Sequence, residues 1–150
     1  RGAGDWLVAA APPYLYFGRD AEALRPDARE ALVQQLLTSL RQMPGVWRAY
    51  AVDAQGVVLP NASVDALDAL VQNSVAPTLA GDLFLVLSPY WIFGSGYEHG
   101  THHGTPWDYD RQVPVIVWPA RALSPHDAGE VLPMTDVAIT MKRFLTAPDR

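Results

Sequence analysis

A continuous apolar run, Leu83-Phe-Leu-Val-Leu87, limits the folds that are open to this chain. Successive side chains of a strand point to opposite faces of a sheet, so five apolar residues in a row predict a strand that is covered on both faces. A half-exposed strand would instead alternate apolar with polar residues. The run therefore predicts a central strand in a sheet that has other elements packed against it.

Further strands are predicted where aromatic and β-branched residues gather between turn residues. The segments 14–17, 46–52 and 57–59 have this composition, and so does the segment 113–118. Pro114 has no N–H to donate to a neighbouring strand, so the last of these is expected to begin there or to lie at an edge.

Helices are predicted between the strands from apolar residues at helical spacing. The clearest helix precedes the Pro44-Gly45 pair, which is a strong stop signal. Three helix starts are expected: a capping box formed by Asp27 and Glu30, a cap at Ser63, and a start at Thr135 or Asp136. The last helix is expected to have Val137, Met141, Phe144 and Leu145 on its buried side. The order is strand, helix, strand, helix, strand, histidine-rich loop, strand and helix. This order predicts an α/β fold, a mixed-sheet layer sandwich with helices packed against the sheet.

Composition sets bounds on domain number and on partners. With 150 residues and 49% hydrophobic content, the chain is long enough for one core, which predicts a single domain over residues 1–150. A net charge of -5 without a basic run argues against a nucleic-acid polymer as partner, and no apolar stretch approaches the roughly 20 residues of a membrane helix. The chain opens with Arg1 rather than Met, which suggests a piece of a longer protein.

Three of the four histidines lie within five positions, at His99, His102 and His103, in a segment rich in glycine. The glycines and Pro106 predict an irregular loop, in which neighbouring side chains such as those of His102 and His103 point to opposite sides. From spacing alone, three interpretations remain open: polar loop residues, metal ligands, or acid-base catalysts. The fourth histidine, His126, is expected to be a solvated loop residue.

The string GTHHGTPWDYDRQVPVIVW resembles the pattern G-T-x-H-G-S/T-P-x-x-Y-D-x-x-V-P of the alkaline phosphatase superfamily, in particular bacterial single-chain alkaline phosphatases close to type I phosphodiesterases and nucleotide pyrophosphatases. The stretches GAGDW with YLYF, AGDLFLVLSP and LPMTDVAIT are also similar to that family. The resemblance covers nearly the whole chain but only the C-terminal portion of a family member. The residues at pattern positions are Gly100, Thr101, His103, Gly104, Thr105, Pro106, Tyr109, Asp110, Val113 and Pro114.

This resemblance implies a site with two zinc ions that support phosphoryl transfer. His103 corresponds to the last zinc-binding histidine of the family, with His102 and His99 as alternative ligands. His102 stands where the family usually has Thr. Asp110 occupies the position of a family Asp, for which we expect a role in orienting the loop, in accepting a hydrogen bond behind a ligand, or in capping a helix or turn.

The function implied is that of the C-terminal part of a zinc-dependent phosphoric ester hydrolase, either a phosphomonoesterase or a phosphodiesterase of the nucleotide pyrophosphatase type. The nucleophile and the other metal ligands of the family would precede Arg1, so the segment by itself is expected to be inactive. Residues from about 14 to 75 would form a lid-like insert, and the parent would be periplasmic or secreted and would act on a phosphate ester. The alternative is a non-catalytic module that keeps the fold and binds a metal or a partner.

Overall fold

The computed structural model describes residues 4–58, 65–94, 103–114, 131 and 133–146. The chain forms two compact units, Arg1–Val113 and Pro114–Arg150, and each is described here by itself. The prediction of a single domain stays a prediction, and so does the lid-like insert over residues 14–75.

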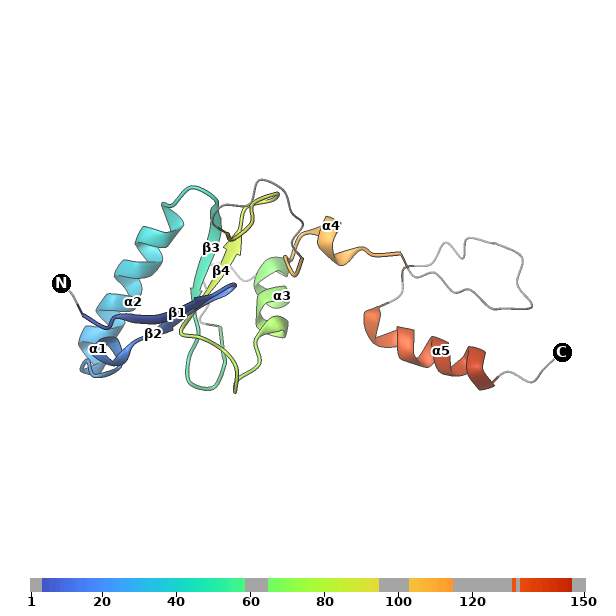
Figure 1. Cartoon of the computed structure of the whole chain (residues 1–150), viewed down its shortest axis with the longest axis horizontal. Coiled ribbons are helices and arrows are strands. Elements are labelled where there is room, and N and C mark those ends of the chain that lie inside the picture. The colour runs from blue at the N-terminus through green and yellow to red at the C-terminus, as the bar shows by residue number, and fades with distance from the viewer. Residues whose placement is uncertain (1–3, 59–64, 95–102, 115–130, 132, 147–150) are drawn as a thin grey trace. The chain divides into compact units, whose positions relative to one another are not determined.

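The first unit holds a sheet and the helices that cover it (Figure 1). Its strands and helices follow one another along the chain, which confirms an α/β fold. The predicted order also includes segments outside the described residues, so the order as a whole stays a prediction. The elements are β1 (Leu7–Ala11), β2 (Tyr14–Phe17), α1 (Arg19–Glu22), α2 (Pro26–Arg41), β3 (Val46–Ala51), α3 (Ala66–Ser74), β4 (Leu83–Leu87) and α4 (Asp108–Arg111).

The four strands are ordered β1-β2-β4-β3, and each neighbouring pair is antiparallel. The prediction of a mixed sheet was therefore wrong for the part of the chain that the structure describes. The physical reason is that β2 and β3, which run in the same direction, are not neighbours. The chain returns through α3 and inserts β4 between them, which converts a parallel pair into two antiparallel pairs.

The central position of β4 confirms the prediction made from its apolar run. Phe84 lies opposite Tyr14 of β2 on one side and opposite Tyr50 of β3 on the other. The side chains of Leu83 and Leu85 point to one face of the sheet, while those of Phe84 and its neighbour in the run, Val86, point to the other. All four are buried because both faces are covered.

Helices α2 and α3 cover opposite faces of the sheet (Figure 1). Alanines on β3 leave room for the leucine side chains of α2, whereas Tyr50 fills the space beneath α3. The buried residues on the α2 face are Phe17, Ala21, Leu37, Ala49, Ala51, Leu83 and Leu85, and those on the α3 face are Tyr50, Val58, Val71, Val75, Phe84 and Val86. The core is thus two apolar layers with the sheet between them.

Both predicted helix starts in this unit differ from the structure. The capping box of Asp27 and Glu30 was wrong, because α2 begins one residue before Asp27, at Pro26, and Arg25 precedes it in an extended conformation without a side-chain cap. Proline suits the first helical position, where its missing N–H is no loss. Helix α3 is capped by Asp65, whose side chain accepts hydrogen bonds from the N–H groups of Leu67 and Asp68.

Two strand predictions also differ from the structure. β1 was not expected, since alanine has little preference for strands, and it forms by pairing with β2. Of the predicted strand at 57–59 the structure describes Val57 and Val58, and there it has an isolated bridge between Val58 and Val52. The turn before it matches the prediction: Asp53 accepts hydrogen bonds from the N–H groups of Gln55 and Val57.

The second unit contains a 3₁₀ turn, η1 (Met134–Asp136), followed by α5 (Val137–Thr146). A helix that begins near Thr135 or Asp136 is therefore confirmed. Met141 was expected on the buried side but is 56% exposed. Phe144 and Leu145 fall outside the side chains that the structure describes, and the predicted strand 113–118 lies outside the described residues beyond Pro114. Among the helices described, none combines the length and apolar character needed to span a membrane.

Candidate functional site

The described part of the histidine-rich segment runs from His103 to Pro114 and contains the short helix α4. His103 is exposed at its start, and Gly104 follows with a left-handed backbone, φ +87°. No heavy atom lies within 4 Å of the position a Cβ would take at Gly104, so this glycine serves the turn rather than a close contact.

Asp110 closes the turn that follows His103. Its Oδ2 accepts a hydrogen bond from the backbone N–H of Thr105 at 3.0 Å and another from the Thr105 hydroxyl at 2.6 Å. One carboxylate oxygen therefore holds the two ends of a six-residue segment together. Of the roles predicted for Asp110, this arrangement agrees with orienting the loop and with capping a turn.

Trp107 anchors the same segment to the sheet. Its indole N–H donates to the carbonyl oxygen of Leu87, at the end of β4, at 3.0 Å. Its ring meets that of Trp47 edge to face, with the centroids 5.8 Å apart, and packs against the core beneath α3. The loop is consequently attached to the end of the central strand by a side-chain contact as well as by its chain connections.

A second aromatic contact joins α4 to the residues after β4. The rings of Tyr90 and Tyr109 are stacked, with centroids 4.8 Å apart and planes 13° from parallel. The backbone N–H of Tyr90 also donates to the hydroxyl oxygen of Tyr109 at 2.9 Å. Spacing within the sequence gave no sign of this pair, because its members are 19 residues apart.

The predicted metal ligands are only partly within view. His103 is described, whereas His99 and His102 lie outside the described residues, as does His126. Over residues 4–58, 65–94, 103–114, 131 and 133–146, no group of three or more His, Asp or Glu side chains is arranged to hold a metal ion. The donor chemistry of His103 suits zinc, but the described residues fit one position of such a site and not a whole site.

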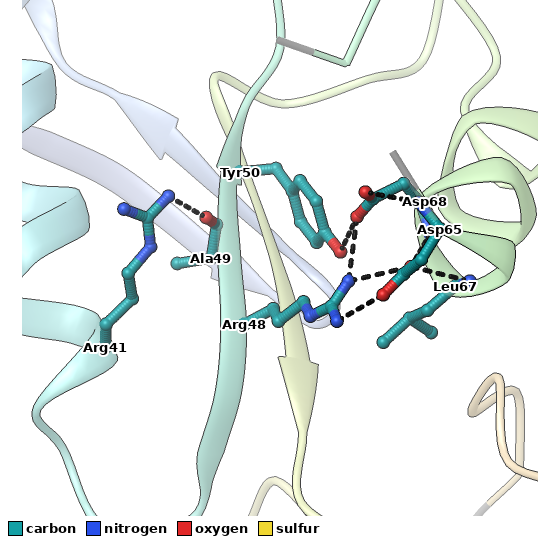
Figure 2. A network of polar contacts seen from close by, with 7 residues as sticks. All are labelled: Arg41, Arg48, Ala49, Tyr50, Asp65, Leu67 and Asp68. Carbon is teal, nitrogen blue, oxygen red and sulfur yellow. Dashed lines mark hydrogen bonds and ion pairs between the residues drawn. The ribbon is translucent and has the colours of Figure 1, made fainter. Parts of the chain in front are cut away.

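A polar network between β3 and α3 was missed by sequence reasoning (Figure 2). Arg48 donates to both carboxylate oxygens of Asp65, at 2.9 and 2.5 Å, and to Oδ1 of Asp68 at 3.0 Å. The Tyr50 hydroxyl donates to the same Asp68 oxygen at 2.7 Å. The network joins β3 to the first turn of α3, and the nearest sequence signal was the pair of acidic residues three apart, typical of a helix start.

The network shifts the pKa values of its members. The hydrogen bonds from the Arg48 guanidinium are the main cause that lowers the pKa of Asp65 to about 2, and the hydrogen bond with Asp65 raises the pKa of Arg48. Burial is the main cause that raises the pKa of Tyr50 to about 12. Tyr50 is thus a neutral hydroxyl donor at ordinary pH, and its burial is that of a core residue.

A polar hollow of about 270 Å³ lies where β3 ends and β4 begins. Its charged groups are engaged within the protein. Arg29 and Asp82 form an ion pair at 2.6 Å, and Asp82 also accepts a hydrogen bond from the backbone of Phe17 at 2.7 Å. Asp53 holds its own turn through the N–H of Val57. The hollow shares no lining residue with the segment from His103 to Pro114.

The structure thus defines an α/β unit that fixes a histidine-bearing loop to the end of its central strand. No family model matches the chain, and no solved structure matches it. The alkaline phosphatase PhoD of Zymomonas mobilis is 26% identical over 155 residues, a region that takes in 98% of this chain and 24% of that protein. The chain therefore spans about a quarter of the length of this relative, and it is distantly related to a phosphatase.

Proposed function

We propose that this chain is the phosphatase-related part of a metal-dependent phosphoric ester hydrolase and that His103 supplies one ligand of its metal site. The observation that carries this proposal is the presentation of His103. The imidazole is exposed at the start of a loop that Asp110 closes and that Trp107 fixes to β4. A ligand held on a rigid support needs little reordering when a metal binds.

Zinc is the proposed metal, because imidazole nitrogen is among its preferred ligands. A zinc ion at a phosphate ester would offset the negative charge on the phosphoryl oxygens. His103 would contribute a nitrogen donor, and Asp110 would act through the loop by holding Thr105 in place. His102 and His99 are the alternative ligands. The alignment with an alkaline phosphatase over almost the whole chain supports phosphate ester hydrolysis as the reaction.

The proposal extends to the whole protein of which this chain would be a part. Its substrate would be a phosphomonoester or a phosphodiester, and its compartment would be the periplasm or the exterior. With one matched ligand, the chain by itself is expected to lack activity, since a catalytic zinc site ordinarily has three protein ligands.

Zinc titration by calorimetry tests the ligand assignment. We expect weak binding to the chain and a loss of affinity of about tenfold or more in His103→Ala, because a nitrogen donor is removed. His102→Ala and His99→Ala should have smaller effects. His126→Ala is the matched control, a histidine outside the family pattern, and should bind zinc like the unmodified chain.

Two results would count against the proposal. Equal losses in all four variants would indicate unspecific binding to histidine, and no binding in any of them would remove the metal site. Hydrolysis of p-nitrophenyl phosphate by the chain alone would show that the prediction of an incomplete site is wrong. Zinc binding at His103 together with no activity after the flanking parts of the protein are restored would favour the non-catalytic module.

A further inference from the structure

The stacked pair of Tyr90 and Tyr109 leaves one aromatic face uncovered. Tyr90 is 84% exposed even though Tyr109 lies parallel to one side of its ring, so the other side faces solvent. Tyrosine is intermediate between apolar and charged residues in how often it is buried, so an exposure this high is unusual for it. Trp91 and Ile92, the next two residues, are also exposed, at 50% and 46%, so three large hydrophobic residues in succession are exposed here.

The position of Tyr90 is held firmly and at some expense in conformational energy. Its backbone lies in the left-handed region, φ 66°, which residues with a side chain rarely adopt. The hydrogen bond from its N–H to the Tyr109 hydroxyl secures this conformation. Beside it, Trp91 packs onto Gly45, whose lack of a side chain makes room for the indole ring. Such strained positions persist where the surroundings determine them and are common in ligand sites.

The pair also belongs to the loop that carries the candidate metal ligand. Tyr109 immediately precedes Asp110, which closes the turn after His103, and it lies two residues after Trp107, which anchors the loop to β4. The exposed ring and the exposed imidazole are therefore supported by the same anchored segment of the first unit.

We propose that the uncovered face of Tyr90 binds a planar aromatic ring. A third ring laid on the pair would continue the stack, with the favourable offset geometry that flat π-systems adopt and that a saturated ring lacks. This further step rests on the proposed hydrolase function: the bound ring would be the organic group of the phosphate ester. The preferred substrates would then be aryl phosphates rather than alkyl phosphates.

Phenol and cyclohexanol are the probes, since they match in size and hydroxyl group and differ in the aromatic ring. Each is titrated into the 150-residue chain while the Tyr90 and Tyr109 ring protons are followed by NMR. We expect phenol to shift the ring protons of Tyr90 upfield, more than those of Tyr109 behind it, and to bind about fivefold more tightly than cyclohexanol. Tyr90→Ala should abolish that preference, whereas Tyr90→Phe, which keeps the ring, should retain it.

Several outcomes would overturn the assignment. Equal binding of the two probes would indicate a general apolar surface. Unchanged phenol binding by Tyr90→Ala, or phenol shifts confined to other aromatic residues, would place the bound ring elsewhere. Circular dichroism establishes that each variant is folded. Tyr109→Phe gives a second test, because it keeps both rings and removes the hydrogen bond between the two tyrosines. This variant should bind phenol more weakly than the unmodified chain.

His103→Ala separates this proposal from the proposed function. This variant should leave phenol binding unchanged. If the unmodified chain binds phenol at Tyr90 but does not bind zinc, the hydrolase assignment is rejected and the ring site is kept. With zinc present, phenyl phosphate should bind about fivefold more tightly than cyclohexyl phosphate. Equal binding of the two esters, with phenol still bound at Tyr90, would reject only the step that concerns substrate.

Discussion

Arg48 is the side chain through which β3 is tied to the start of α3. Its guanidinium bonds two carboxylates at once, that of Asp65, which caps the helix, and that of Asp68, which is buried (Figure 2). A buried carboxylate is tolerated only where partners offset its lost hydration. Arg48 and the Tyr50 hydroxyl are the partners that the structure gives to Oδ1 of Asp68.

Replacing Arg48 with methionine should lower the free energy of unfolding by about 2 kcal/mol, because Asp68 would keep its burial and lose its cationic partner. Urea denaturation at neutral pH measures this change. Arg25→Met is the matched control, since Arg25 and Asp27 are both exposed and their ion pair spans 3.5 Å. The control should change stability by no more than about 0.5 kcal/mol, and a similar loss in both variants would contradict the role given to Arg48.

The same variant has a consequence for acid stability. Hydrogen bonds, first from Arg48 and then from the backbone of the α3 start, lower the pKa of Asp65 from 3.8 to about 2. The stabilisation from this carboxylate is therefore complete above pH 3.8 and is lost as the pH falls toward 2. In Arg48→Met the pKa of Asp65 should rise toward its ordinary value, and this part of the pH dependence should become smaller. Denaturation curves across that pH range check the difference, and curves with identical slopes would speak against it.

At the scale of the elements, glycines decide where two connections can turn. Gly45 links α2 to β3 with φ +85°, and a Cβ there would lie 2.2 Å from the ring of Trp91. Gly104 has almost the same backbone, φ +87°, but no neighbour within 4 Å. The two positions therefore separate the strain of a left-handed backbone from the strain of a steric clash.

Gly45→Ala should destabilise the chain by about 3 kcal/mol, since the left-handed backbone and the clash with Trp91 both contribute. Gly104→Ala should lose only the backbone part, about 1 kcal/mol. Thermal or urea unfolding of the two variants gives the comparison. Adding Trp91→Ala should restore part of the loss in Gly45→Ala, and equal losses at Gly45 and Gly104 would mean that the indole contact is unimportant.

At the scale of the first unit, stability depends on a sheet that is buried on both faces. β4 supplies both apolar layers, because alternate residues of its run face α2 and α3. β4 is buried along most of its length, whereas β1, at one edge, is exposed along its whole length.

Leu83→Ala should lower the free energy of unfolding by about 3 kcal/mol, because this side chain is fully buried and its removal leaves a cavity. Leu79→Ala makes the same chemical change at a side chain that is 73% exposed, and it should cost no more than about 0.5 kcal/mol. Chemical denaturation measures both. Losses of equal size would contradict the two-layer core.

Local patterns were enough to predict the elements that depend on neighbouring residues. The run from Leu83 to Leu87 indicated a central strand, the Pro44-Gly45 pair marked the end of α2, and the residues around Asp53 indicated a turn. In each case the signal and the structure lie within one element, so side-chain periodicity and backbone preference suffice.

Other features were decided only by tertiary contacts. Asp65 caps α3 while also bonding Arg48, which is 17 residues away, and Trp107 reaches the carbonyl of Leu87 across 20 residues. The antiparallel sheet likewise follows from where β4 inserts, which no local pattern records. The sequence by itself determined the strands β2, β3 and β4 and the helices α2, α3 and α5, because their preferences are local. The tertiary structure decided which of them meet, and so where the anchored loop holds His103, because such contacts depend on the path of the whole chain.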